Sequence, residues 1–307
     1  MNLGVQVNSM IASTHALWKT FGRFDALQGV DLGIPEGSVF ALVGTNGAGK
    51  TTTIQLLLNM IAPSQGTTTI LGVDSRRLTP AEWSQIGYVS ENQLMPPQMT
   101  VSSYIGYLRP FYPSWDRSLE GSILQQLNLP PKRKIKDLSH GMRIKMALAC
   151  ALPFRPKLLV LDEPFSGLDP LVREEFMYGL LRRSDQTTVL ISSHELSEID
   201  GLATHLAILD RGKLVCQQTM SAMKSRVREV CITMDAMPDS LPTMPHTWIE
   251  AHREGTKLIF IDANYSEEQL RAQINSILPG VQRIVIHEVS LRSAVASLLR
   301  SARGGNA

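Results

Sequence analysis

The sequence predicts an α/β fold with a parallel sheet at its core. Two short runs, Lys157–Leu161 and Thr187–Ser192, are continuously apolar or β-branched, as expected for strands buried on both faces of a parallel sheet. A third run, Ser38–Val43, leads through a glycine-rich turn into a helix predicted over Thr51–Ile61, which Pro63 helps to terminate. A strand that feeds directly into a helix is the repeating unit of α/β proteins.

Shorter patterns predict the other elements of a first domain over residues 9–220. Residues 9–43 are predicted to form strands and turns. Three further strands are expected at Thr67–Leu71, Ile86–Val89 and Ala207–Leu209. Residues 92–137 are rich in proline with helical pieces between. We therefore expect a helical insertion over about residues 92–155 within this domain.

The pattern changes after Gln217 and predicts a second, small α+β domain over residues 225–307. The predicted strands are Arg228–Met234, Trp248–Arg253, Lys257–Asp262 and Arg283–His287, and the predicted helices are Ser266–Leu278 and Leu291–Arg300.

Composition restricts the function classes. The chain has 307 residues, 43% of them apolar and 19% charged, which excludes a wholly disordered protein. A net charge of +2 argues against a protein that wraps nucleic acid over its whole surface. Cys150, Cys216 and Cys231 form no C-x-x-C pair, which favours a reduced, intracellular compartment. No apolar run reaches the length of a membrane span, and no signal-peptide pattern is present.

The most informative segment follows the first buried strand and matches the phosphate-binding pattern G-x-x-x-x-G-K-[ST]. Its glycines allow backbone N–H groups to face phosphate oxygens, and the helix that follows adds its positive N-terminal dipole. Lys50 is expected to reach the β- and γ-phosphates, and the Thr51 hydroxyl is expected to bind Mg²⁺. The candidate nucleotide-binding residues are Gly44, Thr45, Asn46, Gly47, Ala48, Gly49, Lys50, Thr51 and Thr52.

A second part of the site is predicted where the strand Lys157–Leu161 ends in two carboxylates, Asp162 and Glu163. At the carboxyl edge of the sheet Asp162 would lie beside the phosphate loop and position Mg²⁺. Glu163 would then face the γ-phosphate and activate a water molecule as a general base. The alternative, two acidic residues that only cap the next turn, is weakened by the phosphate loop upstream.

With these motifs in place, the chain over about residues 9–220 resembles the nucleotide-binding subunit of an ATP-binding cassette (ABC) transporter. Leu138–Met142 is similar to the family's signature sequence, and Ser166–Asp169 is similar to its D-loop. His194 stands where the family has its switch histidine, and Phe21 where it has the aromatic residue that stacks on adenine. The resemblance implies a P-loop NTPase fold of the ABC ATPase type, with an N-terminal antiparallel β subdomain and a helical subdomain.

Several of these residues have simpler alternatives when they are taken singly. Ser139 is also a good helix N-cap, His194 could be a hydrogen-bonded structural histidine, and Phe21 could belong to the core. The resemblance favours a γ-phosphate contact for His194. It also implies that Ser139 and Gly141 clamp the γ-phosphate that the opposite subunit of a dimer holds.

The chain departs from the family pattern at three positions. His140 replaces a glycine and Met142 a glutamine of the usual signature LSGGQ. Glu91 stands where the family has its Q-loop glutamine, and as a carboxylate it can still offer an oxygen to Mg²⁺. These departures suggest a regulatory, slowly hydrolysing subunit as a further possibility.

The resemblance implies an ATPase that binds ATP and Mg²⁺ and drives a separate multi-span permease through the region around residues 91–116. It implies a homodimer or a heterodimer with another ABC ATPase subunit at the cytoplasmic face of the membrane, with no nucleic acid expected. Phe111–Asp116 is similar to a segment of bacterial stand-alone exporter subunits. The alternative is a soluble ABC ATPase that acts on nucleic acid or the ribosome. The sequence leaves open the transported substrate and the direction of transport.

Overall fold

The computed structural model describes residues 9–166, 187–236 and 243–304, and the chain divides into two compact units, Met1–Cys216 and Gln217–Ala307. The predicted D-loop residues Gly167, Leu168 and Asp169 lie outside the described residues. Of the described segments, no helix is both long and apolar enough to cross a membrane.

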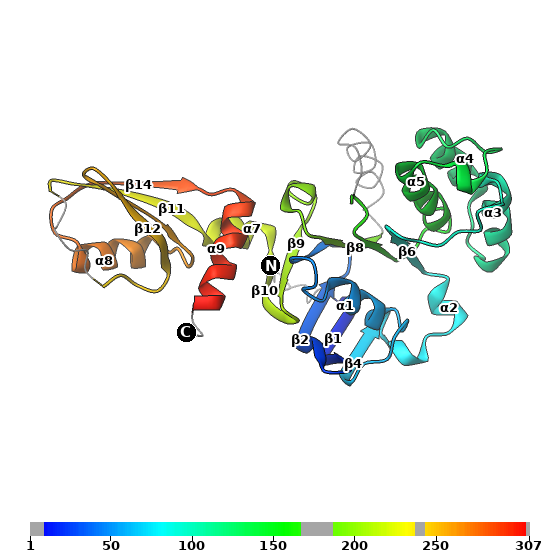
Figure 1. The fold of residues 1–307 in the computed structure, drawn as a ribbon, viewed down its shortest axis with the longest axis horizontal. Helices are drawn as coiled ribbons and strands as arrows, with labels where there is room; N and C mark the ends of the chain where they lie inside the picture. The colour runs from blue at the N-terminus through cyan, green and yellow to red at the C-terminus, as the bar shows by residue number, and fades with distance from the viewer. Residues whose placement is uncertain (1–8, 167–186, 237–242, 305–307) are drawn as a thin grey trace, which may run out of the picture. The chain divides into compact units, whose positions relative to one another are not determined.

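The first unit contains two sheets and a group of helices (Figure 1). A four-stranded sheet has the order β2-β1-β4-β5, and its strands pair antiparallel. Its strands are β1 (Met10–Phe21), β2 (Phe24–Pro35), β4 (Gln65–Ile70) and β5 (Val73–Asp74). This is the N-terminal antiparallel β subdomain that the resemblance implied.

A six-stranded sheet has the order β10-β9-β3-β8-β7-β6, and β9, β3, β8, β7 and β6 run parallel to one another. Its strands are β3 (Val39–Val43), β6 (Ile86–Ser90), β7 (Leu158–Asp162), β8 (Thr188–Ser193), β9 (His205–Asp210) and β10 (Lys213–Thr219). Every residue of β3, β7 and β8 is buried. The predicted parallel-sheet core is confirmed.

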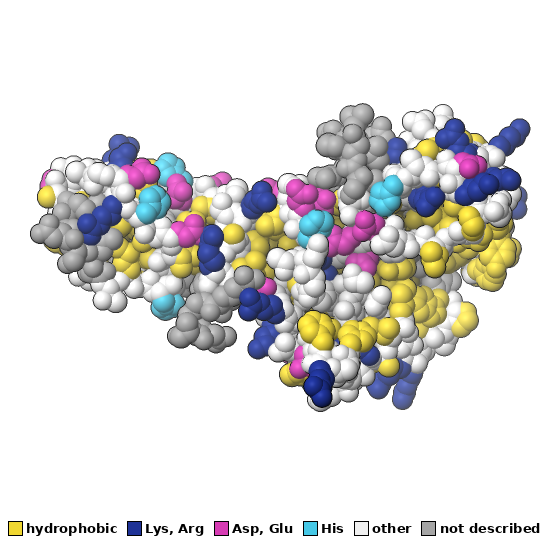
Figure 2. All heavy atoms as spheres, in the orientation of Figure 1, with side chains coloured by type: hydrophobic (Ala, Val, Ile, Leu, Met, Phe, Trp, Pro, Cys, Tyr) yellow, Lys and Arg dark blue, Asp and Glu magenta, His cyan; other side chains and the backbone are white. Residues whose placement is uncertain are grey.

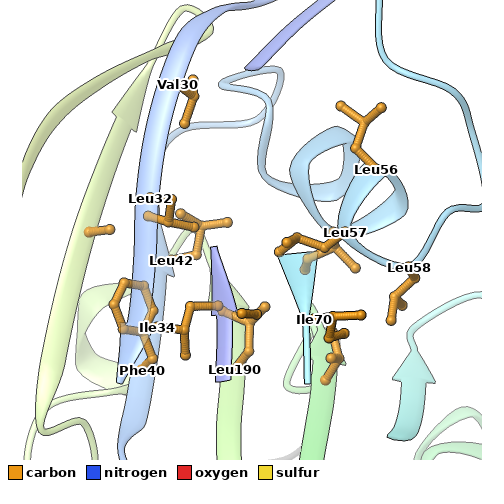
Figure 3. Packing of buried hydrophobic residues seen from close by; sticks show 14 of the residues in the cluster. Val30, Leu32, Ile34, Phe40, Leu42, Leu56, Leu57, Leu58, Ile70 and Leu190 are labelled. Atoms are coloured by element: carbon orange, nitrogen blue, oxygen red, sulfur yellow. The ribbon is translucent and has the colours of Figure 1, made fainter. Parts of the chain in front are cut away.

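Helices and apolar side chains fill both faces of this sheet. Helix α1 (Lys50–Leu57) contributes Ile54, Leu56 and Leu57 to the cluster that also joins both sheets (Figure 3). On the other face, α5 (His140–Ala151) packs Ile144 and Leu148 among alternate residues of β7 and β8. Because β3, β7 and β8 are buried along their whole length, their carboxyl ends are held at one rigid edge.

The helical region between β6 and β7 contains α3 (Val101–Leu108), α4 (Arg117–Gln126) and α5, with short 3₁₀ turns at Arg109–Phe111 and Ile135–Asp137. The short helix α2 (Pro80–Trp83) and a 3₁₀ turn at Ser75–Arg77 precede β6.

An aromatic and charged network holds the helical region together. The ring of Tyr112 stacks on Phe154 with centroids 4.0 Å apart. Trp115 Nε1 donates to the carboxylate of Glu120 at 2.8 Å, which Arg109 also binds through two nitrogens at 2.6 and 2.8 Å. In this region Tyr112 and Trp115 therefore have a packing role.

The described residues of the second unit form a four-stranded antiparallel sheet of order β12-β13-β11-β14, with the helices α7, α8 and α9. Helix α8 contributes Leu270 and Ile274 to a core with Val230, Ile232 and Phe260. The elements are α7 (Met220–Arg226), β11 (Arg228–Met234), β12 (Trp248–Glu254), β13 (Lys257–Asp262), α8 (Glu267–Ile277), β14 (Val281–Glu288) and α9 (Leu291–Gly304). A small α+β C-terminal part is thus confirmed.

Candidate functional site: a phosphate loop beside a carboxylate pair

The phosphate loop lies between β3 and α1, at the carboxyl edge of the parallel sheet. Gly47 has φ 80° and Gly49, the N-cap of α1, has φ 107°, a left-handed conformation that glycine adopts without strain. A side chain at Gly44 would meet the Leu209 carbonyl oxygen at 2.4 Å. Two of the motif glycines are therefore required by conformation and Gly44 by close packing. The first N–H groups of α1, which have no partner within their helix, begin directly behind this loop.

The ammonium group of Lys50 folds back over the loop. It donates to the carbonyl oxygens of Gly44 at 2.7 Å and Thr45 at 3.2 Å. It also lies 3.0 Å from Glu163 Oε1, in a pair whose side chains are 5% and 16% exposed. Phosphate oxygens at this loop would compete for the same cation.

Asp162 is the centre of a buried hydrogen-bond set. The Thr51 hydroxyl donates to Asp162 Oδ1 at 3.1 Å, and the Ser192 hydroxyl donates to the same oxygen at 2.6 Å. Burial raises the pKa of Asp162 above its usual value, and the hydrogen bonds from Ser192 and Thr51 oppose that rise. A cation at this carboxylate would remove the cost of its burial.

Glu163 leaves the strand in a left-handed conformation, with φ 52°. Its N–H donates to the Ser192 hydroxyl at 2.9 Å, and its two carboxylate oxygens contact Lys50 at 3.0 Å and His194 Nδ1 at 2.8 Å. Burial alone would raise the pKa of Glu163, but the hydrogen bonds from His194 and Lys50 outweigh it and hold the pKa below its usual value. Glu163 is therefore a carboxylate at neutral pH.

His194 directly follows β8, and its side chain is 40% exposed. Two hydrogen bonds fix the turn that carries it. The N–H of Glu195 donates to the Ser193 hydroxyl at 2.9 Å, and this hydroxyl is hydrogen-bonded to the buried Glu198. A backbone held on both sides of His194 directs the imidazole to Glu163.

Glu91 is one residue beyond β6 and beside the carboxylate pair. Its N–H donates to the Asp162 carbonyl oxygen at 3.2 Å. Glu91 lines a pocket of about 250 Å³ together with His140 and Arg143 of α5. The structure therefore brings the Q-loop position next to the candidate metal ligand and to the start of the signature helix.

The remaining predicted residues lie elsewhere on the first unit. Ser139 is exposed and caps α5, with its hydroxyl accepting from the Met142 N–H at 3.3 Å. Phe21 is 49% exposed at the tip of the β1–β2 hairpin, with the Lys19 ammonium 4.9 Å from its ring centroid. Among the described contacts, none joins Phe21, Ser139 or Gly141 to the hydrogen-bonded set around Glu163.

Sequence reasoning missed Ser192. It is fully buried and binds both Asp162 and the backbone of Glu163. A signal was available, because two serines close an otherwise apolar strand that was expected to lie in the same sheet. The register Asp162↔Ser192 between β7 and β8, which only the folded sheet sets, places the serine there.

A lysine-bearing glycine loop at a helix N-terminus, with a strand-end carboxylate on its threonine, defines a P-loop nucleotide-binding protein. A family model described as "ABC transporter" matches residues 27–166. The ATP-binding protein YhaQ of Bacillus subtilis, an uncharacterized ABC transporter protein, is 32% identical over 259 residues, which cover 81% of this chain and 86% of YhaQ. The chain belongs to the family of ABC transporter ATP-binding proteins, and its first unit is an ATP-binding domain of that family.

Other relatives agree with this assignment. The bacitracin transport ATP-binding protein BcrA of Enterococcus faecalis is 30% identical over 73% of this chain and 74% of its own length. A nucleotide-free ATP-binding cassette from an ABC transporter matches with a TM-score of 0.58 and 28% identity, over 69% of this chain and 92% of that one. An ATP-binding subunit of an ABC transporter, at 23% identity and a TM-score of 0.65, supports the fold. The predicted family and fold are confirmed, whereas the alternative of a soluble ABC ATPase finds no support.

Proposed function

We propose that this chain is the ATP-hydrolysing motor of an ABC exporter, in which Glu163 activates water and Lys50 holds the phosphates. The observation that carries the proposal is the position of the Glu163 carboxylate, which contacts both Lys50 of the phosphate loop and His194 at the end of β8. A half-buried carboxylate between a phosphate-binding cation and an imidazole suits phosphoryl transfer to water.

ATP would bind with its phosphates over the loop from Gly44 to Thr51. Lys50 would exchange one of its present acceptors for phosphate oxygens. The N–H groups at the start of α1, including those of Thr51 and Thr52, would donate hydrogen bonds to other phosphate oxygens. The exposed ring of Phe21 would stack on adenine, an interaction of about 1–3 kcal/mol by analogy with base–aromatic stacking.

The residues beside the loop fit Mg²⁺. The Thr51 hydroxyl and the Asp162 carboxylate already meet at 3.1 Å, and Glu91 follows the strand next to Asp162. Such oxygen groups are the ligands that Mg²⁺ prefers, together with water and substrate phosphates. Bound there, Mg²⁺ would neutralise charge on the β- and γ-phosphates.

In the hydrolytic step Glu163 would take a proton from the attacking water. The low pKa of Glu163 ensures that the carboxylate is ionised before the reaction. His194, held with Nδ1 at 2.8 Å from Glu163, would orient that carboxylate. With both ring nitrogens protonated it would also donate to the γ-phosphate through Nε2.

A second copy, or another ABC ATPase subunit, would complete each site with Ser139 and Gly141. Both lie at the start of α5, where Ser139 is exposed and Gly141 is half-buried, and the N–H groups of a helix N-terminus favour an anion. This arrangement explains why neither residue joins the set around Glu163 within one copy.

A multi-span permease would bind around residues 91–116. Three large apolar side chains of this stretch are exposed, Leu94 at 95%, Tyr107 at 57% and Phe111 at 61%. Apolar (yellow) and basic (dark blue) side chains share the visible surface of the helical region (Figure 2). The relatives BcrA, a bacitracin transport protein, and DrrA of Streptomyces peucetius, a daunorubicin/doxorubicin resistance protein, favour export. Docked in this way, the chain would lie at the cytoplasmic face of the membrane, where its three free cysteines would stay reduced.

The test is co-purification of the tagged Glu163→Gln protein from detergent-solubilised native membranes in the presence of ATP. The Lys50→Ala, Glu163→Gln double variant is the matched control that should not close on ATP. Recovery of a multi-span protein with the first variant, and less with the second, supports the proposal. Recovery of ribosomes or nucleic acid without any membrane protein would overturn it.

A further inference from the structure

His140 makes a contact that the usual signature sequence cannot make. Its Nε2 lies 3.1 Å from the carbonyl oxygen of Ser166. Because a carbonyl oxygen only accepts, Nε2 must carry the hydrogen of this bond. A glycine at position 140 has no side chain to reach Ser166. The contact is therefore a property of this chain.

The two ends of the contact differ in how firmly they are held. His140 is the first residue of α5, whose residues Ile144 and Leu148 are buried among strands of the parallel sheet. Ser166 ends the turn that starts at Glu163, and its N–H donates to the Glu163 carbonyl oxygen at 3.3 Å. The imidazole thus connects a fixed helix to the far end of a turn whose first residue is the candidate base.

This turn needs support, because Glu163 has φ 52°. A left-handed conformation is unfavourable for a residue other than glycine, and it persists only where the surroundings fix it. The Ser192 hydroxyl fixes the start of the turn through the Glu163 N–H, and Phe165, 1% exposed, fixes its middle in the core. His140 holds the end.

We propose that His140 is a positioning residue that orients Glu163 for hydrolysis by holding the Glu163–Ser166 turn against α5. This inference rests on the proposed role of Glu163. His140 also lines the same pocket as Glu91.

The test compares His140→Ala, which removes the donor without lowering helix propensity, with His140→Gln, which offers an amide N–H at a similar reach. His252→Ala in the second unit, an exposed histidine, is the matched control. We expect His140→Ala to lower kcat about three- to tenfold, the effect of one hydrogen bond, with KM for ATP changed less than about twofold. His140→Gln should recover most of the loss.

A second readout does not depend on the proposed function. Hydrogen exchange of a peptide that covers residues 159–166 should be faster in His140→Ala than in wild type and near normal in His140→Gln. Unchanged exchange together with unchanged kcat would overturn the inference. So would unchanged exchange with a raised KM and loss of ATP-dependent dimers in the Glu163→Gln background, because that result assigns His140 to phosphate binding across the dimer. If Glu163→Gln itself retains full hydrolysis, the proposed base is wrong, whereas the exchange result still reports on the His140–Ser166 contact.

Discussion

The Lys50 ammonium and the Glu163 carboxylate lie 3.0 Å apart, and both side chains are largely buried. The cation that would bind phosphate and the base that would activate water are thus linked in one chain. Whatever binds Lys50 more strongly than Glu163 does will release the carboxylate, so phosphate binding and the freedom of the base are coupled.

Replacing Lys50 by alanine should weaken ATP binding itself. A hydrogen bond to a charged group contributes about 1.5–3 kcal/mol, so the Kd for ATP should rise about tenfold or more. Isothermal titration with ATP measures this change, with exposed Lys157→Ala as the control. Wild-type affinity in Lys50→Ala would rule out the phosphate-loop assignment.

Replacing His194 by alanine should shift the acidic limb of the kcat–pH profile to higher pH. The pKa of Glu163 lies below its ordinary value of 4.5, in part because of the hydrogen bond from His194. Glu163 is active when ionised, so activity is lost as the pH falls through its folded pKa. Removing His194 raises that pKa and moves the loss upward. A profile that falls in kcat but keeps its acidic limb would contradict the link between the two residues.

Ser192 should contribute more to stability than its size suggests. The Ser192→Ala variant removes two hydrogen bonds, the one that Asp162 Oδ1 accepts from the hydroxyl and the one that the Glu163 N–H donates to it. The free energy of unfolding should fall by about 1–3 kcal/mol, measured by urea denaturation. Ser118→Ala, at an exposed position of α4, is the control. An equal, small effect at both positions would mean that the Ser192 contacts are not important.

The Arg109–Glu120 pair should stabilise the helical region in a pH-dependent way. Arg109→Ala leaves the buried Glu120 with a weaker set of partners, at a cost of about 1–3 kcal/mol at neutral pH. Burial alone would raise the pKa of Glu120, but the hydrogen bonds from Arg109 and Trp115 outweigh this effect. The pKa of Glu120 therefore lies below its ordinary value of 4.5. The contribution is therefore full above that value and is lost as the pH falls through the folded pKa. The stability difference from wild type should shrink in acid, while Arg23→Ala, at an exposed position between β1 and β2, should show no such pH dependence.

The phosphate loop and the carboxylate pair could be predicted because each is a local pattern. The motif glycines, Lys50 and the end of β7 at Asp162 are encoded within a few neighbouring residues. Strands β11 and β13 were predicted with the bounds that the structure shows. Helix α1 is shorter than predicted: it ends at Leu57 rather than Ile61, because Asn59 takes a left-handed conformation.

Contacts between distant segments could not be predicted in this way. The Ser192–Asp162 bond depends on the register of two strands, and the His140–Ser166 bond depends on how α5 packs on the sheet. The order β12-β13-β11-β14 of the second sheet depends on pairings between strands that are far apart in the chain. In each case the deciding energy is long-range packing, which the local sequence does not contain.

The central claim is that Glu163 is the general base, and the turnover of Glu163→Gln tests it most directly. The measurement is steady-state ATP hydrolysis alongside ATP binding, with Glu268→Gln at an exposed position of α8 as the control. We predict that Glu163→Gln binds ATP like wild type but hydrolyses it at least about 10²-fold more slowly. Unchanged turnover in Glu163→Gln would contradict the account.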